Sequence, residues 1–464
     1  MRPVLLLEVN EVPLRVYQKY AGDPRFPNIR KLLNESVQLD TLISDEGELS
    51  PWCTWPTIHR GMSKRDHGIF HLGQDPATFR GTPIWDEYLK RGLSVGVFGS
   101  LQSWPPKDPG AGGFYIPDTF APSPECRPNW IEPIQALNLG LVRENGRVMV
   151  DGLVSHALNP GLWLSLIRAG VRPSTLARSF FQVVREKFQP MFRQRRVSFQ
   201  ALLFWDIFRG LYNPLRPPAF ATFFTNHIAS VEHRFWNHVF PEDFSAKPAN
   251  REHLATMDFA IKIADEILGE AFEWRRQNPE IILVVANSMG QGARVSKKHE
   301  GFELSVKNIS QLFSTLGVPP GLKQNLAMAP QLTFDVENSI DPALFVQKLS
   351  ALTCRSGRKI LLCESLNKTV TVSVSTPPSN EIEGDVFLLG GREVGISELG
   401  MERLAVDPGT AYHVPEGQIF VQGLETSSLP KKKLVPAEDV KSLLLAWAEI
   451  SPSDTYGKTP EIRV

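Results

Sequence analysis

Hydroxyl and imidazole side chains gather near the start of one predicted helix. The stretch from Ser50 to Gly61 reads SPWCTWPTIHRG and carries Thr54, Thr57 and His59. Its apolar residues recur at helical spacing, which favours packing of this helix on a sheet: Trp52, Trp55 and Ile58. The first turn of a helix presents unpaired N–H groups and a field that attracts anions. This helix start is therefore suited to binding a phosphate or sulfate group.

Polar side chains also follow two predicted strands, at the point where each strand ends. The residues that follow the apolar runs at 4–9 and 281–286 are Asn10 and Glu11, and Asn287, Ser288 and Gln291. Ordinary solvation of a loop would explain either group alone. Two strands that end in polar groups at equivalent places favour a pocket instead.

Histidines form a third group. His227, His233 and His238 lie within twelve residues, directly after a predicted strand, and His413 lies far downstream. Imidazole is both a metal ligand and an acid–base group near neutral pH. A single histidine in such a place is more often structural, whereas three in one short segment favour a functional role.

Units of a strand followed by a helix recur along the chain and would position these groups. Apolar runs predict strands at 4–9, 93–99, 221–225 and 281–286, and amphipathic patterns predict helices that include 257–274 and 437–450. This alternation predicts a three-layer α/β sandwich, in which helices cover both faces of a mainly parallel sheet. Sites in such folds form at the carboxyl ends of the strands, where the polar groups are expected.

Two segments break the alternation and are predicted to be inserts in a core of residues 1–150, 221–330 and 395–464. The first, 151–220, reads as basic helices broken by prolines, in which phenylalanines alternate with arginines. Such a helical cap suits an anionic membrane surface or a polyanion, while no nucleic-acid-binding motif accompanies the charge. Three clustered arginines are expected to form the patch: Arg193, Arg195 and Arg196. The second, 331–394, contains the period-two strand Thr369–Val374 and is predicted to be a small α+β insert.

The composition describes a folded chain without a charge bias. Of 464 residues, 50 are basic and 50 are acidic, so the net charge argues for no particular partner. The 4 cysteines lack the close spacing of a zinc site or a disulfide framework. The apolar run near the N-terminus is too short for a signal peptide or a membrane span. These features predict a cytoplasmic protein that meets a membrane, if at all, from the side.

Several segments, taken in order, resemble the alkaline phosphatase superfamily, in particular its branch of phosphodiesterases and nucleotide pyrophosphatases. These segments are the first strand, Pro27-Asn28-Ile29, Trp55 to Phe70, Val95 to Pro106, Asn287 to Gly290 and Tyr412 to Gly417. The resemblance implies the fold of that superfamily. It also implies a site in which two metal ions, usually zinc, and a threonine or serine nucleophile act on a phosphate ester.

The resemblance places non-ligand residues at several metal positions. The family's aspartate after the first strand falls on Asn10, and an amide is a poor zinc ligand. Its Asp-His-Gly falls on Ser288-Met289-Gly290, and the aspartate of its Asp-x-x-x-His falls on Ala229. A site with two zinc ions is therefore not predicted.

Two histidines keep the positions of family ligands, and they are His233 and His413. Because zinc needs only three protein ligands and an open position, the resemblance implies one divalent ion, zinc or manganese. The third ligand is expected to be Glu8 or Glu11, with His227 as a further candidate.

Two registers are open for the nucleophile. The triplet Thr54-Trp55-Pro56 matches the family's Thr-x-Pro and makes Thr54 the nucleophile, but it leaves Gly61 three residues too close. Counting back from Gly61 without a gap puts Pro51 at that position and Ser50 beside it. The gap-free register also fits the spacing of Thr57, and we prefer it.

The sequence thus predicts a hydrolase or transferase of small phosphate or sulfate esters, similar to phosphodiesterases, with an atypical site poor in metal. The expected catalytic residues are Asn10, Glu11, Thr54 and Thr57. The expected binding residues are His59, Asn287, Ser288 and Gln291. The alternative is a non-catalytic relative that uses the same fold to bind an anionic ligand or a protein partner.

Overall fold

The computed structural model describes residues 1–45, 49–143, 160–244, 250–294, 303–325, 331–337, 339–366, 368–375, 385–404, 409–425, 428–430 and 432–451. The chain forms two compact units. The larger comprises Met1–Phe70, Pro76–Arg294 and Thr410–Val464, and the smaller comprises His71–Asp75 and Val295–Gly409.

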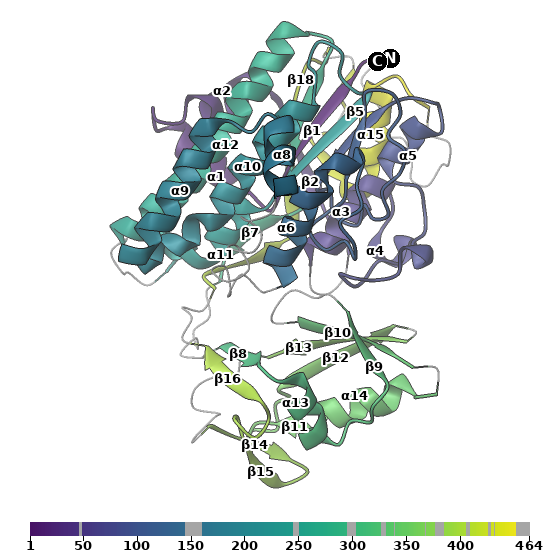
Figure 1. Ribbon diagram of the computed structural model, residues 1–464, viewed down its shortest axis with the longest axis vertical. Coiled ribbons are helices and arrows are strands. Elements are labelled where there is room, and N and C mark those ends of the chain that lie inside the picture. The colour runs from purple at the N-terminus through teal and green to yellow at the C-terminus, as the bar shows by residue number, and fades with distance from the viewer. Residues whose placement is uncertain are drawn as a thin grey trace. The chain divides into compact units, whose positions relative to one another are not determined.

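A mainly parallel sheet forms the centre of the larger unit (Figure 1). Its strands lie in the order β19, β2, β18, β6, β1, β5, β3, β4, and only β18 runs antiparallel to its neighbours. The strands are β1 (Val4–Val9), β2 (Val37–Leu42), β3 (Val95–Phe98), β4 (Phe114–Ile116), β5 (Phe220–Thr225), β6 (Ile282–Ala286), β18 (Glu416–Gln422) and β19 (Leu434–Pro436). A separate antiparallel pair, β7 (Gly290–Ala293) and β17 (Ala411–Val414), also belongs to this unit.

Helices cover both faces of the sheet, so the predicted three-layer α/β sandwich is confirmed. Because side chains alternate along a strand, Leu5 and Leu7 of β1 join one core, while Val4 and Leu6 join the other. The first core lies under α1 (Leu14–Ala21), α2 (Pro27–Glu35), α10 (Arg196–Leu211), α11 (His227–Val239) and α12 (Arg251–Gln277). The second lies under α3 (Pro51–Arg60), α5 (Ile84–Leu89) and α15 (Val440–Trp447).

Helix α3 is the helix predicted from the stretch that begins at Ser50. Pro51 occupies its first position, where the missing N–H costs no helical hydrogen bond, and Ser50 is its N-cap residue. Gly61 ends the helix in a left-handed conformation, with φ of +66°, and its N–H donates to the Thr57 carbonyl. All ten helical residues are buried, which fits the packing role that the tryptophan spacing predicts.

The predicted basic insert, 151–220, does not form a unit of its own. Residues 151–159 lie outside the described residues. The remainder forms α8 (Pro160–Arg168), α9 (Pro173–Phe188) and α10, which follow α6 (Glu132–Arg143). Trp205 and Phe208 of α10 join the first core of the larger unit, and this apolar face is the reason that the segment packs onto the sandwich. Among the described residues, no helix is long and apolar enough to cross a membrane.

The smaller unit extends beyond the predicted insert, 331–394, on both sides. The pairing of β8 with β16 joins chain segments on either side of the predicted range, and the unit has its own apolar core around Phe334, Phe345 and Phe387. Its elements are β8 (Glu303–Val306), α13 (Ile309–Leu316), β9 (Leu322–Asn325), β10 (Gln331–Val336), α14 (Pro342–Ser350), β11 (Leu352–Thr353), β12 (Leu361–Leu366), β13 (Thr369–Val374), β14 (Val386–Leu389), β15 (Arg392–Gly395) and β16 (Met401–Leu404).

Candidate metal centre

Three side chains from distant parts of the chain converge at the carboxyl edge of the central sheet. They are Glu11, His233 and His413, and one ligand atom of each lies within 4.8 Å of the others. Glu11 follows β1, His233 lies on α11 directly after β5, and His413 lies on β17. Since β1 and β5 are parallel neighbours, their carboxyl ends meet at one edge, as the sequence predicts.

The spacing of these atoms suits a single metal ion. Glu11 Oε2 lies 3.0 Å from His233 Nε2 and 3.3 Å from His413 Nε2. Two ligands that each lie 2.0–2.1 Å from a zinc ion in a tetrahedral site are about 3.3 Å apart. The two imidazole rings stand at 71° to each other, with centroids 5.1 Å apart, so each nitrogen reaches the carboxylate from its own direction.

Backbone carbonyls determine which ring nitrogens face Glu11. His413 Nδ1 donates to the Leu49 carbonyl at 2.7 Å, and His233 Nδ1 donates to the Ala411 carbonyl at 3.3 Å. Because a carbonyl can only accept, Nδ1 carries the hydrogen in both rings. In the neutral rings Nε2 therefore carries no hydrogen and directs a lone pair at a carboxylate. A proton or a metal ion between these atoms removes that repulsion.

Glu11 itself is buried and held in place by two amides. Asn10 Nδ2 donates to Oε1 at 2.7 Å, and Gln291 Nε2 donates to Oε2 at 2.5 Å. The Glu11 backbone adopts a φ of +61°, which is uncommon for a residue with a side chain. Burial would raise the pKa of Glu11, but hydrogen bonds and charge from His233 and His413, when each ring also carries a proton on Nε2, lower it below its usual range. Glu11 is thus a carboxylate, the form that binds metals.

Asn10 connects the centre to two other chain segments. Its Oδ1 accepts from Trp55 Nε1 of α3 at 2.8 Å, and its Nδ2 also donates to Asn226 Oδ1, after β5, at 2.7 Å. Asn10 therefore acts through Glu11 and the surrounding backbone. The sequence pointed to Asn10 but not to its partners Trp55 and Asn226, because hydrogen bonds between distant segments leave no local pattern.

The two threonines predicted as catalytic have partners elsewhere. Thr54 Oγ1 and Ser288 Oγ lie 2.7 Å apart, and both residues are fully buried. Thr57 Oγ1 lies 3.2 Å from His67 Nε2 and donates to the Cys53 carbonyl at 3.2 Å. Ser288 therefore contacts Thr54. Neither threonine hydroxyl is hydrogen-bonded to the candidate ligands Glu11, His233 and His413.

The start of α3 lies beside the centre, because the Leu49 carbonyl binds His413. The helix begins with Pro51, the residue at the nucleophile position in the gap-free register. Ser50, immediately before it, is 7% exposed, and its hydroxyl makes no hydrogen bond with the described residues. Ser50 therefore lies next in the chain to Leu49, which binds His413.

Glu8, His59 and His227 lie outside the converging group. Glu8 Oε1 and His59 Nε2 form a buried pair 2.8 Å apart between β1 and α3. Both nitrogens of His227 are engaged, Nδ1 with the Thr225 hydroxyl at 2.7 Å and Nε2 with the Ala260 carbonyl at 3.0 Å. Burial lowers the pKa of His227 to about 4, so this ring stays neutral. Of the two carboxylates that the sequence left open, the structure brings Glu11 to the histidines.

The predicted binding residues Asn287 and Gln291 have different surroundings. Asn287 Nδ2 donates to the Val12 carbonyl, and Asn287 Oδ1 accepts from the Gln418 N–H, so this amide joins three chain segments. Gln291 is the cross-strand neighbour of His413 in the β7–β17 pair, and it donates to Glu11. Gln291 is therefore part of the centre, whereas Asn287 supports the loops beneath it.

The sequence did not point to Glu232, which lies on α11 beside His233. It is 1% exposed, and neither carboxylate oxygen has a hydrogen-bond partner among the described residues. Burial, together with the charge of Glu11, raises the pKa of Glu232 well above its usual range. Glu232 lies on the apolar face of α11 that Ile228 and Val231 form. An acidic residue on an apolar helix face is the sequence feature that could have identified it.

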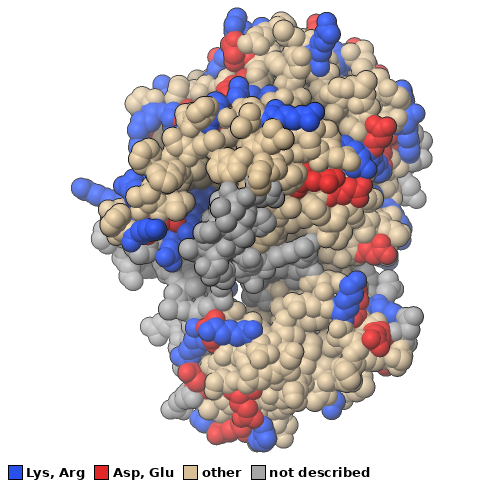
Figure 2. All heavy atoms as spheres, viewed as in Figure 1, with Lys and Arg blue, Asp and Glu red and all other residues tan. Residues whose placement is uncertain are grey.

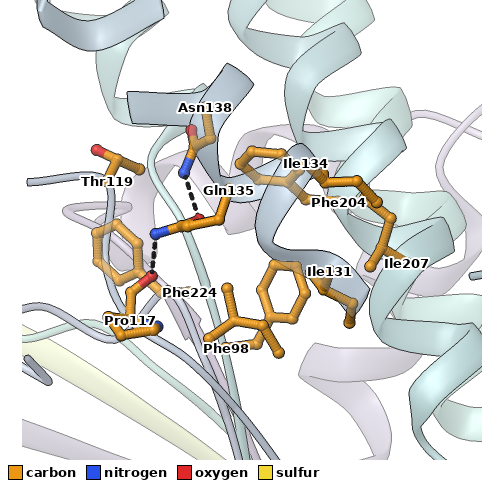
Figure 3. A pocket seen from close by; sticks show the side chains of 12 residues that line it. Phe98, Pro117, Thr119, Ile131, Ile134, Gln135, Asn138, Phe204, Ile207 and Phe224 are labelled. Carbon is orange, nitrogen blue, oxygen red and sulfur yellow. Dashed lines mark hydrogen bonds between the residues drawn. The ribbon is translucent and has the colours of Figure 1, made fainter. Parts of the chain in front are cut away.

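An apolar pocket lies at the same edge of the sheet, past the ends of β3, β4 and β5 (Figure 3). Its apolar lining includes Phe98, Ile116, Ile131, Ile134, Phe204, Ile207 and Phe224. Gln135 supplies a polar side, because its Nε2 donates to the Pro117 carbonyl at 3.1 Å while its Oε1 accepts from Asn138 Nδ2 at 3.2 Å. The pocket thus combines a mostly apolar lining with two oriented amides.

No family model and no curated protein matches the chain. Among solved structures, an inactive murine ectonucleotide pyrophosphatase/phosphodiesterase 5 in complex with AMP is similar, with a TM-score of 0.46 and 10% identity over 99% of this chain and 98% of that chain. The human protein of that name gives 0.45 and 9% identity, over 99% and 97%. Phosphonoacetate hydrolase from Sinorhizobium meliloti, in complex with phosphonoacetate, gives 0.44 and 14% identity, over 96% of each chain.

Proposed function

We propose that this protein is a hydrolase or transferase of small phosphate or sulfate esters, of the alkaline phosphatase type, with one divalent ion at Glu11, His233 and His413. The convergence of Glu11 Oε2 with two Nε2 atoms carries this proposal. Both rings are oriented by backbone carbonyls, the arrangement that metal-binding histidines commonly have. The phosphate or sulfate class rests on the ordered motifs of the sequence.

The donor set fits zinc or manganese, because two imidazoles and one carboxylate leave an open position for a substrate. A divalent ion bound there would supply charge stabilisation for a phosphoryl or sulfuryl group. Gln291 and Asn10 hold the carboxylate of Glu11 at the spacing that the two histidines require. The start of α3 favours an anion on the same side, because the N-terminus of a helix carries partial positive charge.

The attacking group is proposed to be the Ser50 hydroxyl or a water molecule. We do not assign this role to Thr54, because its hydroxyl is buried against that of Ser288. The apolar pocket past β3, β4 and β5 would take an apolar group of the substrate, since it opens at the same edge of the sheet.

One observation favours the non-catalytic alternative. Pro51 stands at the first position of α3, where the resemblance expects a hydroxyl nucleophile, and a proline side chain can neither attack nor donate. In this alternative the same centre binds an anionic ligand without turning it over.

Turnover by the metal-loaded protein distinguishes the two functions. We expect hydrolysis of at least one of three generic substrates, a phosphate monoester, a phosphate diester and a sulfate ester of p-nitrophenol. His233→Ala should lower it about a hundredfold or more. His253→Ala is the matched control, because His253 is a partly buried histidine outside the centre, bonded to His238. Metal binding without turnover would favour the non-catalytic function, and the absence of both would overturn the proposal.

A further inference from the structure

Helix α9 directs its apolar side chains at the solvent. Ala177, Phe180, Phe181, Val184 and Phe188 recur at the spacing of one helical face and form what we call the α9 stripe. Phe180 is 66% exposed, Phe181 is 68% exposed and Phe188 is 81% exposed. An amphipathic helix on a globular protein normally has the opposite orientation.

Polar contacts fix this orientation from the other side of the helix. The buried residues of α9 are Thr175, Gln182 and Glu186. Gln182 Nε2 donates to Glu186 Oε1 at 2.8 Å, and Glu186 Oε2 pairs with Arg196 of α10 at 2.6 Å. Arg178 pairs with Glu266 of α12 at 3.0 Å. Because these groups lose their partners if α9 rotates, the exposed stripe is a built feature of the fold.

The stripe is large for an uncovered surface. With roughly 200 Å² for each aromatic side chain, the three phenylalanines expose on the order of 400 Å². Soluble monomers seldom leave larger contiguous apolar patches, and those they leave often serve interactions.

The charges around the stripe indicate what covers it. On a helical projection Arg185 and Lys187 lie about 80° to either side of the stripe centre, and both are exposed. Between residues 160 and 205 Glu186 is the only acidic residue, and it is buried against Arg196. In Figure 2 the surface over α9, at the left, shows uncharged side chains bordered by Lys and Arg. A second copy of this surface would bring like charges together, whereas an anionic surface complements them.

We propose that α9 lies in the surface of an anionic lipid bilayer. The phenylalanines of the stripe insert at the boundary between head groups and acyl chains, and Arg185 and Lys187 contact lipid phosphates. The preceding helix α8 has the same character, since Leu164 is 68% exposed, Ile167 is 74% exposed and Arg168 is exposed beside them.

The basic residues in this proposal differ from the three arginines predicted from the sequence, Arg193, Arg195 and Arg196. Arg196 is committed to Glu186, and Arg195 is half-buried over the rings of Phe192 and Phe259. The guanidinium of Arg185 also lies over the Phe192 ring, 3.7 Å from its centroid, but Arg185 stays exposed. Burial lowers the pKa of Arg195 to about 10. Of that trio only Arg193 is exposed.

Co-sedimentation with vesicles tests the proposal on the whole 464-residue chain. The wild type should bind vesicles of phosphatidylcholine with phosphatidylserine and not vesicles of phosphatidylcholine alone. The double variant Phe181→Ser, Phe188→Ser should bind at least about tenfold more weakly. The double variant Arg185→Glu, Lys187→Glu should lose about as much, and added salt should weaken the binding of the wild type.

A control variant combines one charge reversal and one change of an apolar residue to serine at another exposed site. Lys433→Glu with Leu434→Ser alters one basic and one apolar residue near β19, where Leu434 is 52% exposed, and should bind vesicles like the wild type. Absence of vesicle binding by the wild type, or full binding by the phenylalanine variant, would overturn the proposal. So would a dimer of the wild type that the phenylalanine variant converts to monomers without any vesicle binding, because a second copy would then cover the stripe. None of these outcomes bears on turnover at the metal centre.

Discussion

At the scale of single residues, the candidate centre depends on how Glu11 is held. Its carboxylate accepts from Asn10 and Gln291 and faces two ring nitrogens. Glu11 and the two amides are buried, whereas His233 and His413 are partly exposed. Groups that position a ligand in this way commonly affect metal affinity nearly as much as the ligands do. Gln291 is such a positioning residue, since it also anchors itself on the Ala229 carbonyl at 3.2 Å.

Replacing Gln291 by leucine should therefore weaken zinc binding by a factor of about 10 to 100 without removing a ligand. Competition with a coloured chelator measures the affinity. Gln135→Leu is the control, because Gln135 is a buried glutamine in the apolar pocket, outside the centre. Equal zinc affinity in the two variants would contradict a positioning role for Gln291.

The sequence could identify the two histidines through its resemblance to a family, but it could not choose between Glu8 and Glu11. The choice depends on the backbone. Glu8 is still within β1 and its side chain points at His59 of α3, whereas Glu11 follows the strand in a left-handed conformation. Local sequence does not determine that conformation for a glutamate. The partners of Asn10 were hidden for a related reason, since Trp55 and Asn226 come from other segments.

At the scale of elements, the start of α11 determines where His233 lies. His227 is the first residue of the helix, and its ring connects the end of β5 to α12 through Thr225 and Ala260. His233 follows six residues later on the same rigid helix. A buried, neutral His227 thus fixes the position and rotation of the helix that carries a candidate ligand.

This burial predicts a loss of stability in mild acid. The pKa of His227 is about 4 in the folded protein, against 6.5 for an unperturbed histidine. The unfolded chain therefore takes up a proton that the folded chain refuses. The neutral His227 ring contributes fully to the free energy of unfolding above pH 6.5. This contribution declines as the pH falls toward 4, by about 3 kcal/mol in total. His227→Gln keeps a donor for Ala260 and cannot titrate, so its urea midpoint should fall less steeply over this range. Parallel declines in the two proteins would contradict the assignment.

Periodicity predicted two kinds of strand. The continuous apolar run of β1, in the central sheet, and the alternating pattern of β13, in the smaller unit, both have the predicted bounds, 4–9 and 369–374. Periodicity leaves the orientation of α9 open for a physical reason. It shows which residues share a face of the helix but not which face meets solvent, and here Gln182 and Glu186 are buried through long-range polar contacts.

At the scale of the whole molecule, the centre belongs to one unit. Glu11, His233 and His413 all lie in the larger unit, and the smaller unit has a core of its own. The larger unit is interrupted between Arg294 and Thr410, where the Arg294 N–H donates to the Thr410 carbonyl at 2.9 Å. Because these residues are adjacent across an antiparallel pair, a short turn would join them as a hairpin. Metal binding should therefore not require residues 295–409.

The central claim is that Glu11, His233 and His413 hold one divalent ion, and the zinc content of the purified protein tests it most directly. After dialysis against buffered zinc, the wild type should retain about one equivalent. Glu8→Gln and a variant with a short turn in place of residues 295–409 should retain the same amount, while Glu11→Gln should retain essentially none. A wild type without zinc, or a Glu11→Gln variant with as much zinc as the wild type, would contradict the account.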